Sequence, residues 1–159
     1  MTPRAEYPLD PLLRVREARV DDATRAVAEA VHEVDATRDA RAAAEAARLR
    51  AGEAAQAIRA SERDVLEEGG LTAADLARAD AWEAKIRDDD RRLFDAAARA
   101  AEAESRAVLD EARARAELAK YKVDADVVSK DRDAWTNEVR RRVEAKEEED
   151  AEEAWRRKA

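Results

Sequence analysis

Residues 67–75, Glu-Glu-Gly-Gly-Leu-Thr-Ala-Ala-Asp, decide the fold of this 159-residue chain. Glycine reaches positive φ without steric cost and commonly follows the end of a helix, so Gly69-Gly70 favours a reversal of the chain. Thr72 is a good N-cap for a new helix, and Asp75 stands three residues later, as in a capping box. We therefore predict an all-α fold, a long antiparallel two-helix coiled-coil hairpin with its turn at Gly69-Gly70.

The segments on either side of the glycines predict a single elongated domain over residues 1–159. We expect an extended lead over 1–10, a first helix over 11–68, a turn over 69–72 and a second helix over 73–157. At 1.5 Å per residue these helices would be roughly 85 Å and roughly 125 Å long, which leaves an overhang from about residue 129. Folding the sequence at the glycines would place Leu13 near Val127.

The composition favours long helices and excludes most chemical functions. Charged residues make up 44% of the chain and aromatic residues only 4%, and such a composition is typical of a coiled coil, with disorder as the alternative. The net charge of −8 argues against a nucleic-acid partner. The chain has no cysteine and one histidine, His32, which we expect to be an ordinary surface residue. We predict no enzyme activity, no catalytic residue, no cofactor and no metal site.

Apolar residues repeat at heptad spacing in both expected helices. In the first helix Leu13, Val20, Val27 and Val34 recur every seven residues, as in a coiled coil. From Ala40 to Ala60 the expected seam becomes mostly alanine, with Leu49 and Ile58 as its larger members and a local bend expected at Gly52. The second helix begins a similar series with Leu76, Ala79, Trp82 and Ile86.

Tryptophans mark two candidate contact regions in a chain with so few aromatic residues. Trp82 lies near the turn, where it could simply pack beneath the loop or could anchor a partner, since tryptophan dominates many interface hot spots. The expected overhang carries Trp135, Val139, Val143 and Trp155. Apolar residues without an intramolecular partner suggest an external one, although a frayed C-terminal helix would leave the same residues exposed.

Three stretches resemble the FliJ/YscO (SctO)-type stalk proteins of type III secretion. The residues from Tyr7 to Glu17, YPLDPLLRVRE, look like the family's short apolar opening before a long charged helix. Gly70-Leu71, followed by Trp82 and Ile86, matches the spacing of its loop and tip. The C-terminal run looks like the K/H-R-x-x-W-x-x-E-x-x-R series and acidic tail of the injectisome branch, and it comprises Lys130, Arg132, Trp135, Glu138, Arg141, Glu144 and Glu147.

The resemblance implies a stalk that links and stimulates a hexameric secretion ATPase and contacts a membrane-embedded export gate, with secretion chaperones as further candidate partners. The expected ATPase-binding residues are Leu9, Leu12, Leu13, Val20, Trp135, Val139, Arg140, Arg141 and Arg142. The expected export-gate-binding residues are Trp82, Ile86 and Leu93. Such a protein would lie in the cytoplasm, at the cytoplasmic face of the apparatus, and would be a monomer when alone in solution.

Two other functions remain open on the residues alone. The chain could be a stand-alone coiled-coil scaffold or holdase-like chaperone that dimerises through an exposed seam, and its oligomeric state would distinguish this function from a stalk. It could also bind a membrane surface through an amphipathic helix, but its polar faces carry as many acids as bases, unlike helices that bind anionic lipid. The sequence has no apolar run of about 18 residues, so we expect no direct membrane insertion.

Overall fold

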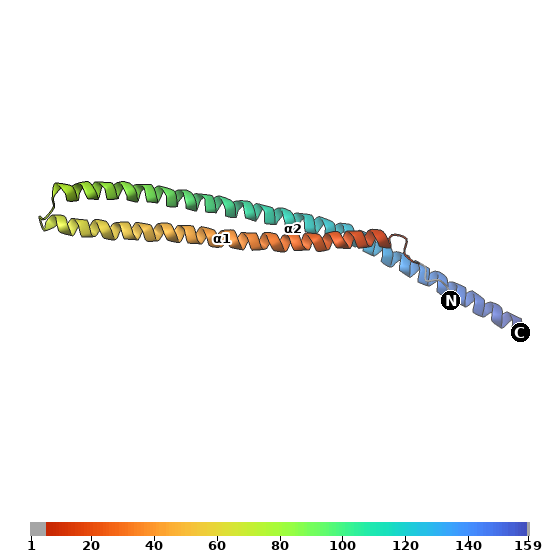
Figure 1. The fold of residues 1–159 in the computed structure, drawn as a ribbon. Helices are drawn as coiled ribbons and strands as arrows, with labels where there is room; N and C mark the ends of the chain where they lie inside the picture. Colours follow the sequence, from red (N-terminus) through yellow and green to blue (C-terminus); the bar gives the residue numbers. More distant parts are fainter. Residues whose placement is uncertain (1–5, 159) are drawn as a thin grey trace. The chain divides into compact units, whose positions relative to one another are not determined.

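Two long helices make up almost all of the chain in a computed structural model that describes residues 6–158. Helix α1 runs over Asp10–Glu67 and helix α2 over Ala73–Lys158 (Figure 1), and the described residues contain no strand. The predicted all-α helical hairpin is therefore confirmed, with Gly69-Gly70 in the turn. Residues 1–5 of the expected N-terminal lead lie outside the described residues.

The chain divides into two compact units, and each helix contributes to both. The first unit comprises Met1–Ala28 and Arg113–Ala159, so it holds the beginning of α1 and the end of α2. The second unit comprises Glu29–Ala112 and holds the turn with the parts of both helices that adjoin it. In each unit the two helices run antiparallel, side by side (Figure 1).

Backbone and side-chain hydrogen bonds fix the turn. Gly69 has a φ of 77°, in the left-handed region that favours glycine, and its N–H donates to the carbonyl of Leu66 at 3.2 Å. The predicted capping box forms. The N–H of Thr72 donates to the carboxylate of Asp75 at 2.9 Å, and the N–H of Asp75 donates back to the Thr72 hydroxyl at 3.3 Å. Hydrogen bonds from the hydroxyl and the N–H of Thr72 lower the pKa of Asp75.

The helix interface of the first unit contains the larger buried side chains. Leu13 and Val128 pack together in one buried cluster, whereas Val127, which we expected opposite Leu13, is 60% exposed. Val128 follows Tyr121 and precedes Trp135 by seven residues each. The heptad repeat therefore selects the residue that faces α1, and counting residues outward from the turn misses it by one position.

The helix interface of the second unit is built from small and charged residues. Its buried side chains are Val34, Ala55 and Ala107, so little apolar area is removed from water along it. Arg41 and Arg48 continue the seven-residue series that begins with the valines of the first helix. Ion pairs between the helices accompany them: Arg38–Glu104 at 3.6 Å, Arg41–Glu104 at 3.1 Å, Arg48–Asp90 at 3.4 Å and Arg59–Glu83 at 2.6 Å.

Two predicted seam residues lie outside the interface. Leu49 is 65% exposed, because the heptad series passes through Arg48 and leaves the next residue facing solvent. Leu76 is also exposed, because it lies in the first turn of α2, where the helix interface ends. At Gly52, where we expected a local bend, α1 continues without a break in its helical structure.

Candidate protein-interaction surfaces

A small apolar cluster in the first unit holds the N-terminal segment against α2. We define the base cluster as Tyr7, Leu13, Val128 and Trp135. Leu13 is 2% exposed and Tyr7 is 5% exposed, and the ring centroids of Tyr7 and Trp135 are 5.6 Å apart with their planes tilted by 58°. Tilted aromatic pairs at this distance add stabilisation beyond the area they bury. The start of α1 and the segment before it are thus packed onto one face of α2.

Polar contacts reinforce the base cluster. The Tyr7 hydroxyl donates a hydrogen bond to the carboxylate of Asp131, and this bond, together with burial and the negative charge of Asp131, raises the pKa of Tyr7 to about 12. The phenol therefore remains a donor to a higher pH than an ordinary tyrosine does. The guanidinium of Arg16 donates to the backbone carbonyl of Asp124 at 2.5 Å. Both bonds join the N-terminal part of the chain to α2.

The last part of α2 has no partner within the described chain. Every residue from Arg140 to Arg157 is exposed, and the side chain of Trp155 is 74% exposed. Its ion pairs lie within the helix at i, i+4 spacing: Arg140–Glu144 at 3.9 Å, Arg142–Glu138, Arg156–Glu152 at 3.4 Å and Arg157–Glu153 at 3.3 Å. Exposed pairs of this kind contribute little to stability, so this segment is a free charged helix with a few apolar side chains.

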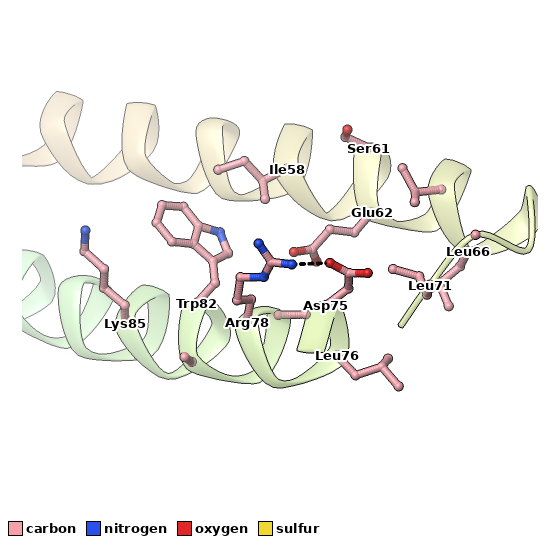
Figure 2. A pocket seen from close by; sticks show the side chains of 14 residues that line it. Ile58, Ser61, Glu62, Leu66, Leu71, Asp75, Leu76, Arg78, Trp82 and Lys85 are labelled. Carbon is pink, nitrogen blue, oxygen red and sulfur yellow. Dashed lines mark hydrogen bonds and ion pairs between the residues drawn. The ribbon is translucent and has the colours of Figure 1, made fainter. Parts of the chain in front are cut away.

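A groove of about 870 Å³ lies between the two helices beside the turn in the second unit. Its apolar wall includes Ile58, Val65, Leu66, Leu71, Leu76 and Trp82. Figure 2 shows Ile58 on α1 and Trp82 on α2 facing the space between the helices, with Leu76 directed outward at the beginning of α2. Arg78 on the same wall donates to Asp75 at 2.5 Å. We call this region, residues 58–85, the loop end.

Trp82 sits between this groove and a second one. The second groove, of about 790 Å³, shares Ile58, Trp82 and Lys85 with the first. It continues along the small residues Ala51, Gly52 and Ala55 to Phe94, whose ring lies 4.9 Å from the guanidinium carbon of Arg48. The ammonium of Lys85 lies 5.2 Å from the centre of the Trp82 ring. The indole N–H of Trp82 is buried and has no hydrogen-bond partner among residues 6–158.

A comparison with protein families shows which family the chain belongs to. The model of the YscO-like protein family matches residues 4–155, which is nearly the whole chain. The chain belongs to the YscO-like family. The resemblance to FliJ/YscO-type proteins is thereby confirmed, and it makes this a type III secretion protein of the stalk type. Searches of curated proteins and of solved structures gave no match.

The residues predicted for ATPase binding in this YscO-like protein divide into an interior and an exterior set. Leu13 is buried in the base cluster, Trp135 packs against it, and Val20 and Val139 are half-buried. The exterior set is exposed and available to a partner: Leu9, Leu12, Arg140, Arg141 and Arg142. The exposed residues lie on the N-terminal part of α1 and the segment before it, and on the free part of α2.

The residues predicted for export-gate binding are partly covered rather than fully exposed. Trp82, Ile86 and Leu93 are half-buried. The exposed large apolar side chains of the same unit are instead Leu49, Val65, Leu66, Leu76, Phe94, Val108 and Leu109. Val65 and Leu66 were not predicted as contact residues from the sequence. A signal was present, because they are the last apolar residues before the glycines.

Two classes of site find no support in the described part of the YscO-like chain. Residues 6–158 contain no group of three or more histidine, cysteine, aspartate or glutamate side chains arranged to hold a metal ion. None of the described helices combines the length and the apolar character required to cross a bilayer. The candidate sites in the described residues are the two exposed surfaces: the exterior set in the first unit, and the loop end in the second.

Proposed function

We propose that this protein is the central stalk of a type III secretion apparatus, that it binds and stimulates the hexameric secretion ATPase, and that it contacts the export gate. The observation that carries the proposal is the family match over residues 4–155, because it includes the base cluster, the turn and most of the free part of α2. The protein would act by contact alone, without chemistry of its own, at the cytoplasmic face of the apparatus.

The first unit supplies the proposed ATPase-binding end. Leu9 and Leu12 expose apolar surface, and Arg140-Arg141-Arg142 adds positive charge on the free part of α2. A protein that makes unequal contacts with six identical subunits can favour different nucleotide states in them, and differential contact is what coupling requires. Leu13, Val20, Trp135 and Val139 would serve this end by holding the exposed residues in place.

The second unit supplies the proposed export-gate end. Apolar side chains, including that of Trp82, line the groove beside the turn. Aromatic residues of this kind commonly anchor protein interfaces. Trp82, Ile86 and Leu93, which are half-buried, would form the inner part of this contact. Secretion chaperones are further candidate partners, and we propose that the protein is a monomer when it is alone in solution.

The experiment that tests the proposal is ATP hydrolysis by the hexameric secretion ATPase of the same organism, measured while this protein is titrated in. Stimulation should saturate near one copy per hexamer. The double variant Leu9→Ser and Leu12→Ser should stimulate less, whereas Leu49→Ser, which changes a leucine exposed in the second unit, should leave stimulation unchanged. Far-UV circular dichroism should show the same helix content in all three proteins.

A dimerising scaffold or holdase-like chaperone is the competing function. The exposed Trp155 and Val143 on the free part of α2 favour it, because a second copy could cover them. Light scattering decides between the two functions. A stable homodimer, together with no change in ATP hydrolysis at any ratio, would overturn the stalk proposal and leave the scaffold.

A further inference from the structure

The loop end combines exposed aliphatic side chains with uncompensated negative charge. Val65, Leu66 and Leu76 are exposed on either side of the turn, and Leu71 lies half-buried between them. These four residues, which we call the aliphatic patch, all line the groove beside the turn. Figure 2 labels three of them: Leu66, Leu71 and Leu76. Apolar side chains gathered on the surface of a chain this polar mark a contact site more often than a free surface.

The end of α1 has the opposite charge from the one that stabilises a helix C-terminus. The carbonyl end of a helix carries partial negative charge and is stabilised by lysine or arginine. The last turn of α1 has no basic residue, and Asp64, Glu67 and Glu68 lie there or directly after it. None of these three carboxylates forms an ion pair with another residue of the described range 6–158. A cationic partner would therefore relieve repulsion that the chain itself leaves uncompensated.

We infer that the loop end docks into a protein site with an apolar depression and a rim of lysine or arginine side chains. The aliphatic patch would fill the depression, and Asp64, Glu67 and Glu68 would pair with the basic rim. Nucleic acid and anionic lipid do not fit, because their phosphates would meet the acidic end of α1. The inference rests on the proposed function in taking the export gate as the partner, and it specifies the chemistry by which the gate would recognise the stalk.

The test is binding of the full chain to the purified cytoplasmic domain of the export-gate protein of the same system. Affinity is measured at about 0.05 M and about 0.5 M salt, because screening removes contributions from exposed charges. The charge variant is Glu67→Gln with Glu68→Gln. Its control is Glu53→Gln with Asp95→Asn, which makes the same change of charge at exposed residues of the same unit. The apolar variant is Leu66→Ser, with Leu49→Ser as its control.

The charge variant should bind roughly tenfold more weakly than the native chain at low salt and equally at high salt, while its control follows the native chain. Leu66→Ser should weaken binding at both salt concentrations, and Leu49→Ser should not. If Leu66→Ser weakens binding but the charge variant keeps the native salt dependence, the basic rim is overturned although the gate contact stands. If all four variants bind as the native chain does, the docking site lies elsewhere. If the native chain does not bind, the proposed gate contact itself fails.

Discussion

The base cluster and the loop end close a two-helix interface in different ways. At the base cluster, Tyr7 folds back onto Trp135 and hydrogen-bonds Asp131, so the apolar side chains are covered by the chain itself. At the loop end, Leu66 and Leu76 stay exposed beside a groove. The difference indicates that the aromatic pair serves the protein's own stability. The loop end leaves its apolar surface uncovered, which the proposed contact with another protein requires.

The largest expected effect of a substitution on stability belongs to the base cluster. Leu13→Ala removes a side chain that is 2% exposed, and we expect it to lower the free energy of unfolding by about 3 kcal/mol. Leu49→Ala changes an exposed leucine and should cost less than about 0.5 kcal/mol. Urea unfolding followed by circular dichroism at 222 nm measures both. Equal costs for the two variants would show that the base cluster is not a stabilising core.

The second prediction concerns high pH, where the two regions should differ. The pKa of Tyr7 is raised in the folded protein from 10.0 to about 12. Its contribution to stability is therefore complete below about pH 10 and is lost as the pH rises toward 12. In a chain carrying Trp82→Phe and Trp155→Phe, the fluorescence of Trp135 should change over this range.

Tyr7→Phe in the same background is the control for the alkaline transition, because phenylalanine has no proton to lose. With phenylalanine at position 7, the change in Trp135 fluorescence between pH 10 and 12 should disappear. A second chain that keeps Trp82 as its sole tryptophan should report no transition at the loop end. A transition in Trp135 fluorescence that survives Tyr7→Phe would contradict the prediction.

Much of this fold could be predicted because the decisive signals are local. Gly69 needs its positive φ, and Thr72 and Asp75 satisfy each other three residues apart, so neighbouring residues specify the turn. The heptad repeat likewise predicted Leu13 as a seam residue. The alanine-rich region gave a weaker signal, and Leu49 was misplaced there because arginine occupies the neighbouring heptad position.

The contact surfaces could be predicted less well, because they depend on which side chains the other helix leaves uncovered. Trp82 was identified from its rarity, yet the structure places it half-buried between two grooves, while exposed Leu66 and Phe94 drew no attention. The hydrogen bond between Tyr7 and Asp131 joins residues that are 124 positions apart in the sequence. No local pattern in the sequence could indicate that pair.

The third prediction tests the cap that begins α2 at the loop end. Thr72→Ala removes the hydroxyl partner of Asp75 and should cost about 1 kcal/mol of unfolding free energy. Thr136→Ala, which removes an exposed hydroxyl bonded within the helix to the carbonyl of Arg132, should cost much less. Thermal unfolding measured by circular dichroism gives both values. Comparable losses would mean that the capping box does not stabilise the turn.

The same cap gives the loop end an acid sensitivity that complements the alkaline sensitivity of the base cluster. The pKa of Asp75 is lowered from its ordinary value of 3.8, mainly by the hydroxyl of Thr72. Its contribution to stability is therefore present above about pH 4 and is lost as the pH falls through the lowered pKa. From pH 5 downward, the free energy of unfolding of the native protein should fall by more than that of the Thr72→Ala variant.

The smallest expected effect concerns Gly52, which lines the second groove. A Cβ added there meets nothing within 4 Å, and the residue lies inside an unbroken helix. Gly52→Ala should therefore raise the free energy of unfolding by about 0.5–1 kcal/mol, and the neighbouring Ala54→Gly should lower it by a similar amount. Gly69→Ala should also lower it, because that position requires a φ of 77°.

A gain in stability from Gly52→Ala would sharpen the contrast between the two regions. The base cluster is built from large apolar side chains that stabilise the fold. Gly52, in contrast, would be a position where one added methyl group makes the protein more stable. The affinity of the Gly52→Ala variant for the export-gate domain would show whether a partner needs the space beside Gly52 in the second groove. If this variant were instead less stable than the native chain, α1 would need glycine there for its own packing.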